Sequence, residues 1–176
     1  MRKYLAVMLI SGIVSCTNTE KKVAGNSDTI SNIKAAGVAV ELKDGKVQAI
    51  YNGYISLKDA LVSTKFEEAK KAALTLKTDL ANYKGCESTA LIADKIATAA
   101  DIKTQRKEFT SLSSDVIALF KHADLVKGSI YVQHCPMANN NEGGDWLSTD
   151  SKIQNPYYGD EMMECGRVVE EIKSSK

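Results

Sequence analysis

The chain has 176 residues, of which 44% are hydrophobic and 26% are charged, as is typical of one soluble globular domain with a sizeable core. Its 23 lysine and arginine residues nearly balance 22 acidic residues, which argues against nucleic-acid binding and against a polybasic membrane-binding surface. Only two histidines are present, so a histidine-rich zinc site of the usual enzymatic kind is disfavoured.

The first sixteen residues have the pattern of an export signal. A basic start, Arg2-Lys3, precedes an apolar run over residues 4–14. That run is too short for a membrane-spanning helix, which needs about 20 residues, and has the length of a signal-peptide core. The ending Ile13-Val14-Ser15-Cys16 resembles the lipobox of bacterial lipoproteins, in which the cysteine is lipidated. We predict a signal peptide over residues 1–15 and a lipid on Cys16, the alternative being an ordinary signal peptide with an incidental cysteine.

The lipid anchor implies a location. Removing residues 1–15 would take away Arg2 and Lys3 and leave the remaining chain close to neutral. Thr17 stands where an inner-membrane retention signal would place an aspartate, so the expected location is the bacterial cell envelope, lipid-anchored in the outer membrane and facing the periplasm. Residues 16–46 are polar and weakly periodic, which predicts a flexible tether with a short strand at Val38 to Leu42.

The middle of the chain has a helical pattern. Between Tyr54 and Lys127 there is one glycine, Gly85, and no proline, the two residues that most often interrupt helices. Apolar residues recur there every three or four positions, as in amphipathic helices. The spacing predicts helices over about 47–63, 65–84, 88–100 and 101–126.

Two helix starts carry capping signals. Thr64 with Glu67 has the spacing of a capping box for the second helix, and Asp101 is a suitable N-cap for the last. Four amphipathic helices with short turns predict a mainly α domain over residues 47–176. We expect an antiparallel four-helix bundle, with a C-terminal irregular segment containing a short strand packed against it.

The composition changes after Lys127. Both prolines, the only tryptophan and several glycines lie in this last part of the chain, so we expect turns and one strand at Ser129 to His134. Trp146 and Leu147 should be buried as an anchor, although the tryptophan and tyrosine side chains of this part could instead form a surface that binds a partner. The asparagines and glycines of residues 139–144 predict a tight loop, since both residue types tolerate left-handed conformations.

Sulfur-containing residues are concentrated in the segment 128–172. Cys135 and Met137 would project to the same side of an extended chain, and Met162 and Cys165 would share one face of a helical turn. Thiolates and thioethers are soft ligands that select Cu(I), or less specifically Zn(II). These four residues are therefore candidate ligands for Cu(I) or Ag(I). His134 is a further candidate only if the chain turns, because it points away from Cys135 along a strand.

A disulfide is the alternative. Exported proteins usually oxidise their cysteines, and a bond between Cys135 and Cys165 would close a loop of about 30 residues, stabilising the fold by about 3–4 kcal/mol in the chain-entropy model. Met137 and Met162 would then fill gaps in the core. A cysteine pair that switches between a disulfide and a reduced, metal-binding form is also consistent with the sequence. Cys86 fits neither hypothesis.

The C-terminal motifs are similar to those of a bacterial domain family of unknown function. The residues concerned are Tyr131-Val132-Gln133-His134-Cys135-Pro136-Met137-Ala138, Trp146-Leu147-Ser148, Asn155-Pro156-Tyr157-Tyr158-Gly159, Met162 and Cys165-Gly166. That family occurs as secreted or lipoprotein single domains and as the C-terminal module of periplasmic adaptor subunits of copper and silver efflux systems. The resemblance, over roughly residues 48–172, implies a helical domain that binds copper through Cys135, Met137, Met162 and Cys165. Because this chain carries no adaptor domains, it implies a free-standing carrier or sink rather than a pump component.

Catalysis is not predicted. The chain has no Ser/His/Asp set, glycine-rich phosphate loop or His-x-x-x-His pair, and Cys135-Pro136-Met137 is not a Cys-x-x-Cys redox motif. The expected function is soft-metal binding by a lipoprotein, in metal buffering or in hand-off to an efflux adaptor. A structural or interaction module with a disulfide and no metal is the alternative. Expected partners are the membrane, through the lipid, and such an adaptor, but no nucleic acid.

Overall fold

The computed structural model describes residues 39–174, which contain both helices and antiparallel sheets. A short strand, β1 (Glu41–Leu42), is followed by four long helices, which are α1 (Gly45–Val62), α2 (Phe66–Ala81), α3 (Glu87–Thr98) and α4 (Ile102–Phe120). The C-terminal part holds β2 (Leu125–Lys127), β3 (Ser129–Cys135), α5 (Ala138–Asn141), β4 (Gly144–Ser148), the 3-10 helix η1 (Gly159–Glu161) and β5 (Arg167–Lys173).

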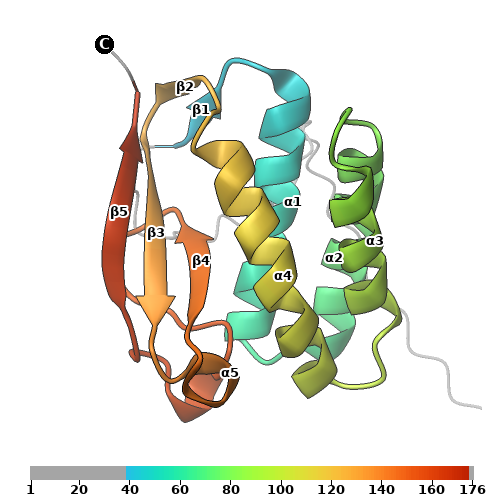
Figure 1. Ribbon diagram of the computed structural model, residues 1–176, viewed down its shortest axis with the longest axis vertical. Coiled ribbons are helices and arrows are strands. Elements are labelled where there is room, and N and C mark those ends of the chain that lie inside the picture. The colour runs from blue at the N-terminus through green and yellow to red at the C-terminus, as the bar shows by residue number, and fades with distance from the viewer. Residues whose placement is uncertain (1–38, 175–176) are drawn as a thin grey trace, which may run out of the picture. The chain divides into compact units, whose positions relative to one another are not determined.

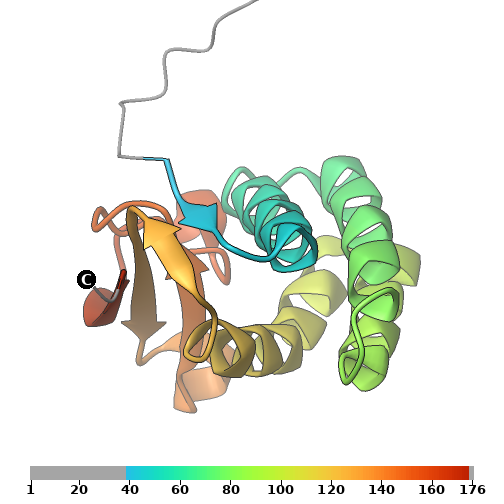
Figure 2. The same cartoon turned by 90° about the horizontal axis from the view of Figure 1, so that it is seen from above.

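The elements form three layers. An antiparallel sheet of order β4-β3-β5 lies against α1 and α4, and α2 and α3 cover the opposite side of these two helices (Figures 1 and 2). A second, two-stranded sheet joins β1 to β2. The predicted helical content is present, but the described residues combine these helices with small antiparallel sheets and contain more β structure than was predicted.

The helices follow the apolar spacing of the sequence. Buried positions of α2, for example, are Ala69, Ala73, Leu76 and Leu80, which step by three or four residues. The predicted boundaries of the first three helices are close to those observed. The prediction of a last helix reaching residue 126 is wrong, because α4 ends at Phe120 and Leu125 pairs with Leu42 of β1.

One predicted cap is present and the other is not. The Asp101 carboxylate accepts a hydrogen bond from the Thr104 backbone N–H at 2.7 Å, as an N-cap does. The predicted capping box at Thr64 is wrong, because Thr64 has a left-handed backbone (φ 54°) and α2 begins after Lys65. The Thr64 hydroxyl instead accepts a hydrogen bond from Arg106 at 3.1 Å.

The C-terminal segment is a regular sheet rather than an irregular chain with one strand. The predicted strand at 129–134 is confirmed as β3, and it pairs with both β4 and β5. In β4, Trp146 and Leu147 are fully buried, as predicted. The predicted left-handed loop is also present, since φ is positive at Asn139, Asn140, Asn141 and Gly143.

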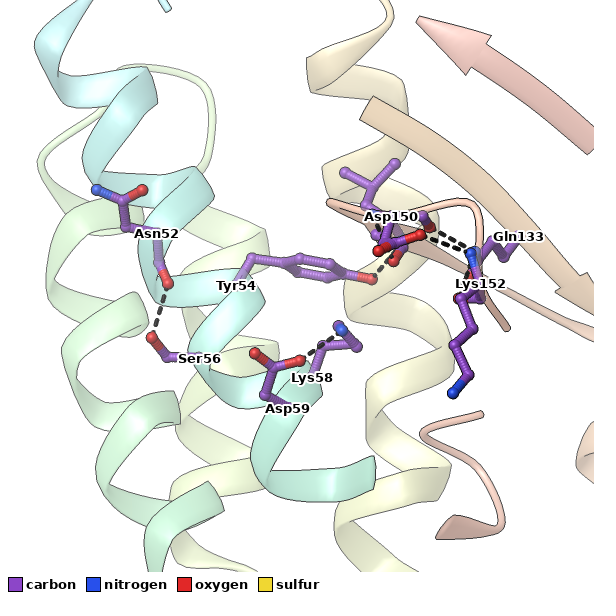
Figure 3. A network of polar contacts seen from close by, with 10 residues as sticks. Asn52, Tyr54, Ser56, Lys58, Asp59, Gln133, Asp150 and Lys152 are labelled. Carbon is purple, nitrogen blue, oxygen red and sulfur yellow. Dashed lines mark hydrogen bonds and ion pairs between the residues drawn. The ribbon is translucent and has the colours of Figure 1, made fainter. Parts of the chain in front are cut away.

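A buried polar network connects the helices to the sheet. Tyr54 extends from α1 into the interior, where its hydroxyl lies 2.6 Å from the Ser113 hydroxyl of α4 and accepts the Leu147 backbone N–H of β4 at 3.1 Å (Figure 3). The fully buried Gln133 of β3 donates to the carbonyls of Asp150 and Lys152 at 2.8 and 3.2 Å. These bonds hold the sheet against the helices and hold the loop after β4 against β3. The C-terminal end of β3, where Cys135 lies, therefore has a defined position.

Candidate soft-metal site

The two cysteines of the C-terminal segment are in contact. Cys135 is the last residue of β3 and Cys165 lies in the turn before β5, yet their Sγ atoms are 2.8 Å apart. The register explains this, because His134 pairs with Arg167 and the two chains leave the sheet side by side. The convergence that the sequence suggested is therefore present for this pair.

A glycine makes the close approach possible. Gly166 follows Cys165 and has φ +149°. A Cβ atom at this position would lie only 2.9 Å from both the His134 carbonyl oxygen and Cη2 of Trp146. A side chain would therefore push the Cys165 turn away from the end of β3.

The two thiols differ in their surroundings. Cys135 is fully buried, whereas Cys165 is half-buried. The hydrogen bond to Cys135, together with burial and charge on Cys135, raises the pKa of Cys165, while a bond from the Met137 backbone lowers it by a smaller amount. Burial, followed by negative charge on the two cysteines, also raises the pKa of Tyr158.

The methionines lie in the same two turns as the cysteines. Met137 follows Cys135 by two residues and is 45% exposed. The predicted extended chain through Met137 is not present, because β3 ends at Cys135 and a turn follows. The predicted turn at the other segment is present, since the Cys165 backbone N–H donates to the Met162 carbonyl at 3.2 Å. Met162 itself is half-buried.

His134 pairs with Asp145 and not with the two cysteines. Its Nδ1 lies 2.8 Å from an Asp145 carboxylate oxygen, across the β3–β4 pair, and its side chain is 27% exposed. Adjacent residues of a strand point to opposite faces, so the ring lies away from the Cys135 thiol. Within residues 39–174, no group of three or more His, Cys, Asp and Glu side chains is arranged to hold a metal ion.

The segment Asn155–Tyr158 supports the two turns. The Asn155 side chain is fully buried and its amide donates to the Cys165 carbonyl at 2.8 Å. The Tyr158 hydroxyl donates to the Met137 carbonyl at 2.6 Å. Sequence reasoning missed these contacts, because bonds from side chains to distant backbone atoms leave no periodic signal.

The other sequence candidates lie elsewhere. Cys86 is a free, half-buried cysteine before α3 whose pKa is raised, chiefly by burial. Cys16 lies outside the described residues. The hypothesis of an aromatic partner-binding surface is wrong for Trp146 and Tyr157, because Trp146 is fully buried and Tyr157 is 7% exposed. Their rings pack edge-on, with centroids 6.0 Å apart.

Comparison with known proteins gives one match. A family model described as "Protein of unknown function (DUF3347)" matches residues 50–128. A family of unknown function therefore matches the helical part of the domain, and the C-terminal motifs, with Cys135 and Cys165, lie beyond the matched span. No curated protein and no solved structure matches the chain. Among the described residues, none of the helices combines the length and apolar character needed to cross a membrane.

Proposed function

We propose that this protein binds a single Cu(I) or Ag(I) ion through the thiolates of Cys135 and Cys165. The observation that carries the proposal is the contact between these two sulfur atoms, which are 30 residues apart in the sequence and 2.8 Å apart in the fold. Soft thiolate donors favour Cu(I) over hard cations. The burial of Cys135 would shield a bound ion from water on one side.

The flanking residues fit the same assignment. Met137 and Met162 each lie in one of the two cysteine-bearing turns and are available as thioether ligands. His134 is a weaker candidate, because Asp145 already holds its Nδ1. Helices α1 to α4, which we take to be an antiparallel four-helix bundle, would act as the rigid support of the site and not as part of its chemistry.

The biological role follows from the N-terminal pattern. A lipid on Cys16 would hold the protein in the bacterial outer membrane, facing the periplasm, where it would buffer the metal or hand it to a heavy-metal efflux adaptor. We propose no enzymatic activity. The family resemblance and the lipobox support this role, and the metal is cargo rather than a resident cofactor.

A Cu(I) titration of the reduced full chain tests the proposal. Against a chelator of known affinity, we expect one Cu(I) per chain, and at least a hundredfold weaker binding in both Cys135→Ser and Cys165→Ser, since each variant removes one of two thiolates. Cys86→Ser is the matched control and should bind as the wild type does. Absence of binding by the reduced wild type, or binding that depends on Cys86, would refute the assignment.

The same sulfur contact favours a second candidate function. A Cys135–Cys165 disulfide would staple the end of β3 to the turn before β5, in a structural or interaction module that binds no metal. Mass spectrometry of unreduced protein taken from its native compartment distinguishes the two. A fully bridged pair, combined with no Cu(I) binding after reduction, would establish the module in place of the metal carrier.

A further inference from the structure

The four residues Asn155 to Tyr158 contact four different parts of the molecule. Besides the Cys165 carbonyl, Asn155 bonds the Met163 carbonyl through its own backbone N–H at 2.9 Å. The Pro156 carbonyl accepts a hydrogen bond from Arg106 of α4 at 3.0 Å. The Tyr157 hydroxyl donates to the Asp145 carbonyl of β4 at 2.8 Å. Tyr158 completes the set by bonding the turn after Cys135.

We infer that the segment Asn155–Tyr158 is a positioning clip, which sets the separation of the two sulfur atoms. Asn155 holds the Cys165 turn and Tyr158 holds the Cys135 turn, while Arg106 and Tyr157 fix the clip to the helices and to β4. The inference rests on the proposed function only in taking the sulfur pair as the working site.

The Tyr158 hydroxyl is the part of the clip that can be removed with least disturbance. Its side chain is half-buried, so the Met137 carbonyl can bind water once the hydroxyl is gone. Tyr158→Phe should therefore leave the fold intact and loosen one turn relative to the other. Asn155→Asp is the stronger change, because it keeps the acceptor used by the Tyr157 N–H but replaces the amide that donates to Cys165.

Equilibrium with glutathione measures how close the two thiols are held. The full chain carrying Cys16→Ser and Cys86→Ser has one thiol pair, and its reaction with oxidised glutathione gives the Cys135–Cys165 disulfide and two reduced glutathione molecules, which take up both electrons and both thiol protons. We expect Tyr158→Phe to lower this equilibrium constant about five-fold, the effect of losing one hydrogen bond of ordinary strength. Asn155→Asp should lower it further.

The matched control is Tyr131→Phe, which removes the hydroxyl of another half-buried tyrosine, bonded to Glu171 in the same sheet. We expect it to leave the glutathione equilibrium unchanged, and the two tyrosine variants to share one urea midpoint in the reduced state. A Tyr158→Phe constant equal to the wild type would overturn the inference. An equal fall in Tyr131→Phe, or a urea midpoint lowered only in Tyr158→Phe, would overturn it as well. Failure of the wild type to bind Cu(I) would remove the proposed function and leave this test unaffected.

Discussion

Cys135 and Cys165 form one pair, but solvent reaches them unequally. Cys135 is fully buried at the end of β3, and the half-buried Cys165 is the side from which a reagent, a metal donor or an acceptor can approach. The Met137 backbone bonds Cys165, and the Tyr158 hydroxyl bonds the Met137 carbonyl. Exchange at the site is therefore expected to begin at Cys165.

Alkylation of the reduced protein tests this asymmetry. With iodoacetamide, we expect Cys165 to be modified before Cys135, because the reagent must contact the sulfur atom. The raised pKa of Cys165 means that its rate should still increase at pH values where an ordinary thiol, with a pKa of about 8.5, is already ionised. Peptide mass spectrometry against time and pH gives both rates.

Saturation with Cu(I) supplies the control for this experiment. Copper should protect both residues of the pair while Cys86 continues to react. Modification of Cys135 ahead of Cys165 would contradict the proposed side of approach.

The corner between α1 and α2 supports the site from a distance. Arg106 of α4 donates to the Leu61 carbonyl, the Thr64 hydroxyl and the Pro156 carbonyl, and so joins the corner to the clip. Gly159 lies against this corner with φ +57°. A Cβ atom there would come within 2.5 Å of both the Arg106 guanidinium and the Thr64 hydroxyl.

Gly159→Ala should therefore destabilise the protein. We expect a loss of about 2–4 kcal/mol in the free energy of unfolding, because a left-handed alanine and a steric clash both add to the cost. Urea unfolding of the wild type and the variant measures it. Gly45→Ala, in the first turn of α1 with no atom within 4 Å of the new Cβ, is the control and should lose no stability. Equal stability of Gly159→Ala and the wild type would show that the corner tolerates displacement.

Some elements could be predicted from the sequence because they carry a local signal. The helices bury every third or fourth residue, and Asp101 caps α4 through its own side chain. β5 gave no signal, because it is an edge strand with an almost fully exposed surface and no alternation of buried residues. Thr64 was mispredicted for a different reason, since it ends α1 in a left-handed conformation, with the Lys65 N–H donating to the Ala60 carbonyl at 2.9 Å, and does not cap α2.

The candidate site, too, could be predicted from the sequence only in part. The pairing of Cys135 with Cys165 could be proposed from residue chemistry, because both lie next to turns and share a ligand type. The turn at Met137 was not predictable from strand alternation, which stops where β3 stops. The clip required the fold, because Asn155 and Tyr158 act on carbonyls 10 and 21 residues away.

At the scale of the whole molecule, buried tyrosines connect the layers. Tyr54 joins α1 to α4 and β4, and its ring stacks on Phe109 with centroids 5.5 Å apart. Phe109 in turn contacts Tyr157 of the clip at 5.8 Å. Tyr51 packs edge-on against Phe120, with centroids 5.4 Å apart. Burial raises the pKa of all three tyrosines well above the ordinary value.

The fold should therefore be sensitive to alkali. A tyrosine whose pKa is higher in the folded than in the unfolded protein contributes stability that is fully present below pH 10, the ordinary pKa being about 10, and lost as the pH rises above it. Urea unfolding between pH 8 and pH 11 should show the free energy of unfolding falling above pH 10 by about 1.4 kcal/mol per pH unit for each such tyrosine. In Tyr157→Phe, the fall in the free energy of unfolding above pH 10 should be less steep by about 1.4 kcal/mol per pH unit, because one tyrosine no longer contributes. This holds whatever the stability of the variant at neutral pH. An unchanged slope in this variant would mean that Tyr157 ionises within the folded protein, and that the clip is open to solvent.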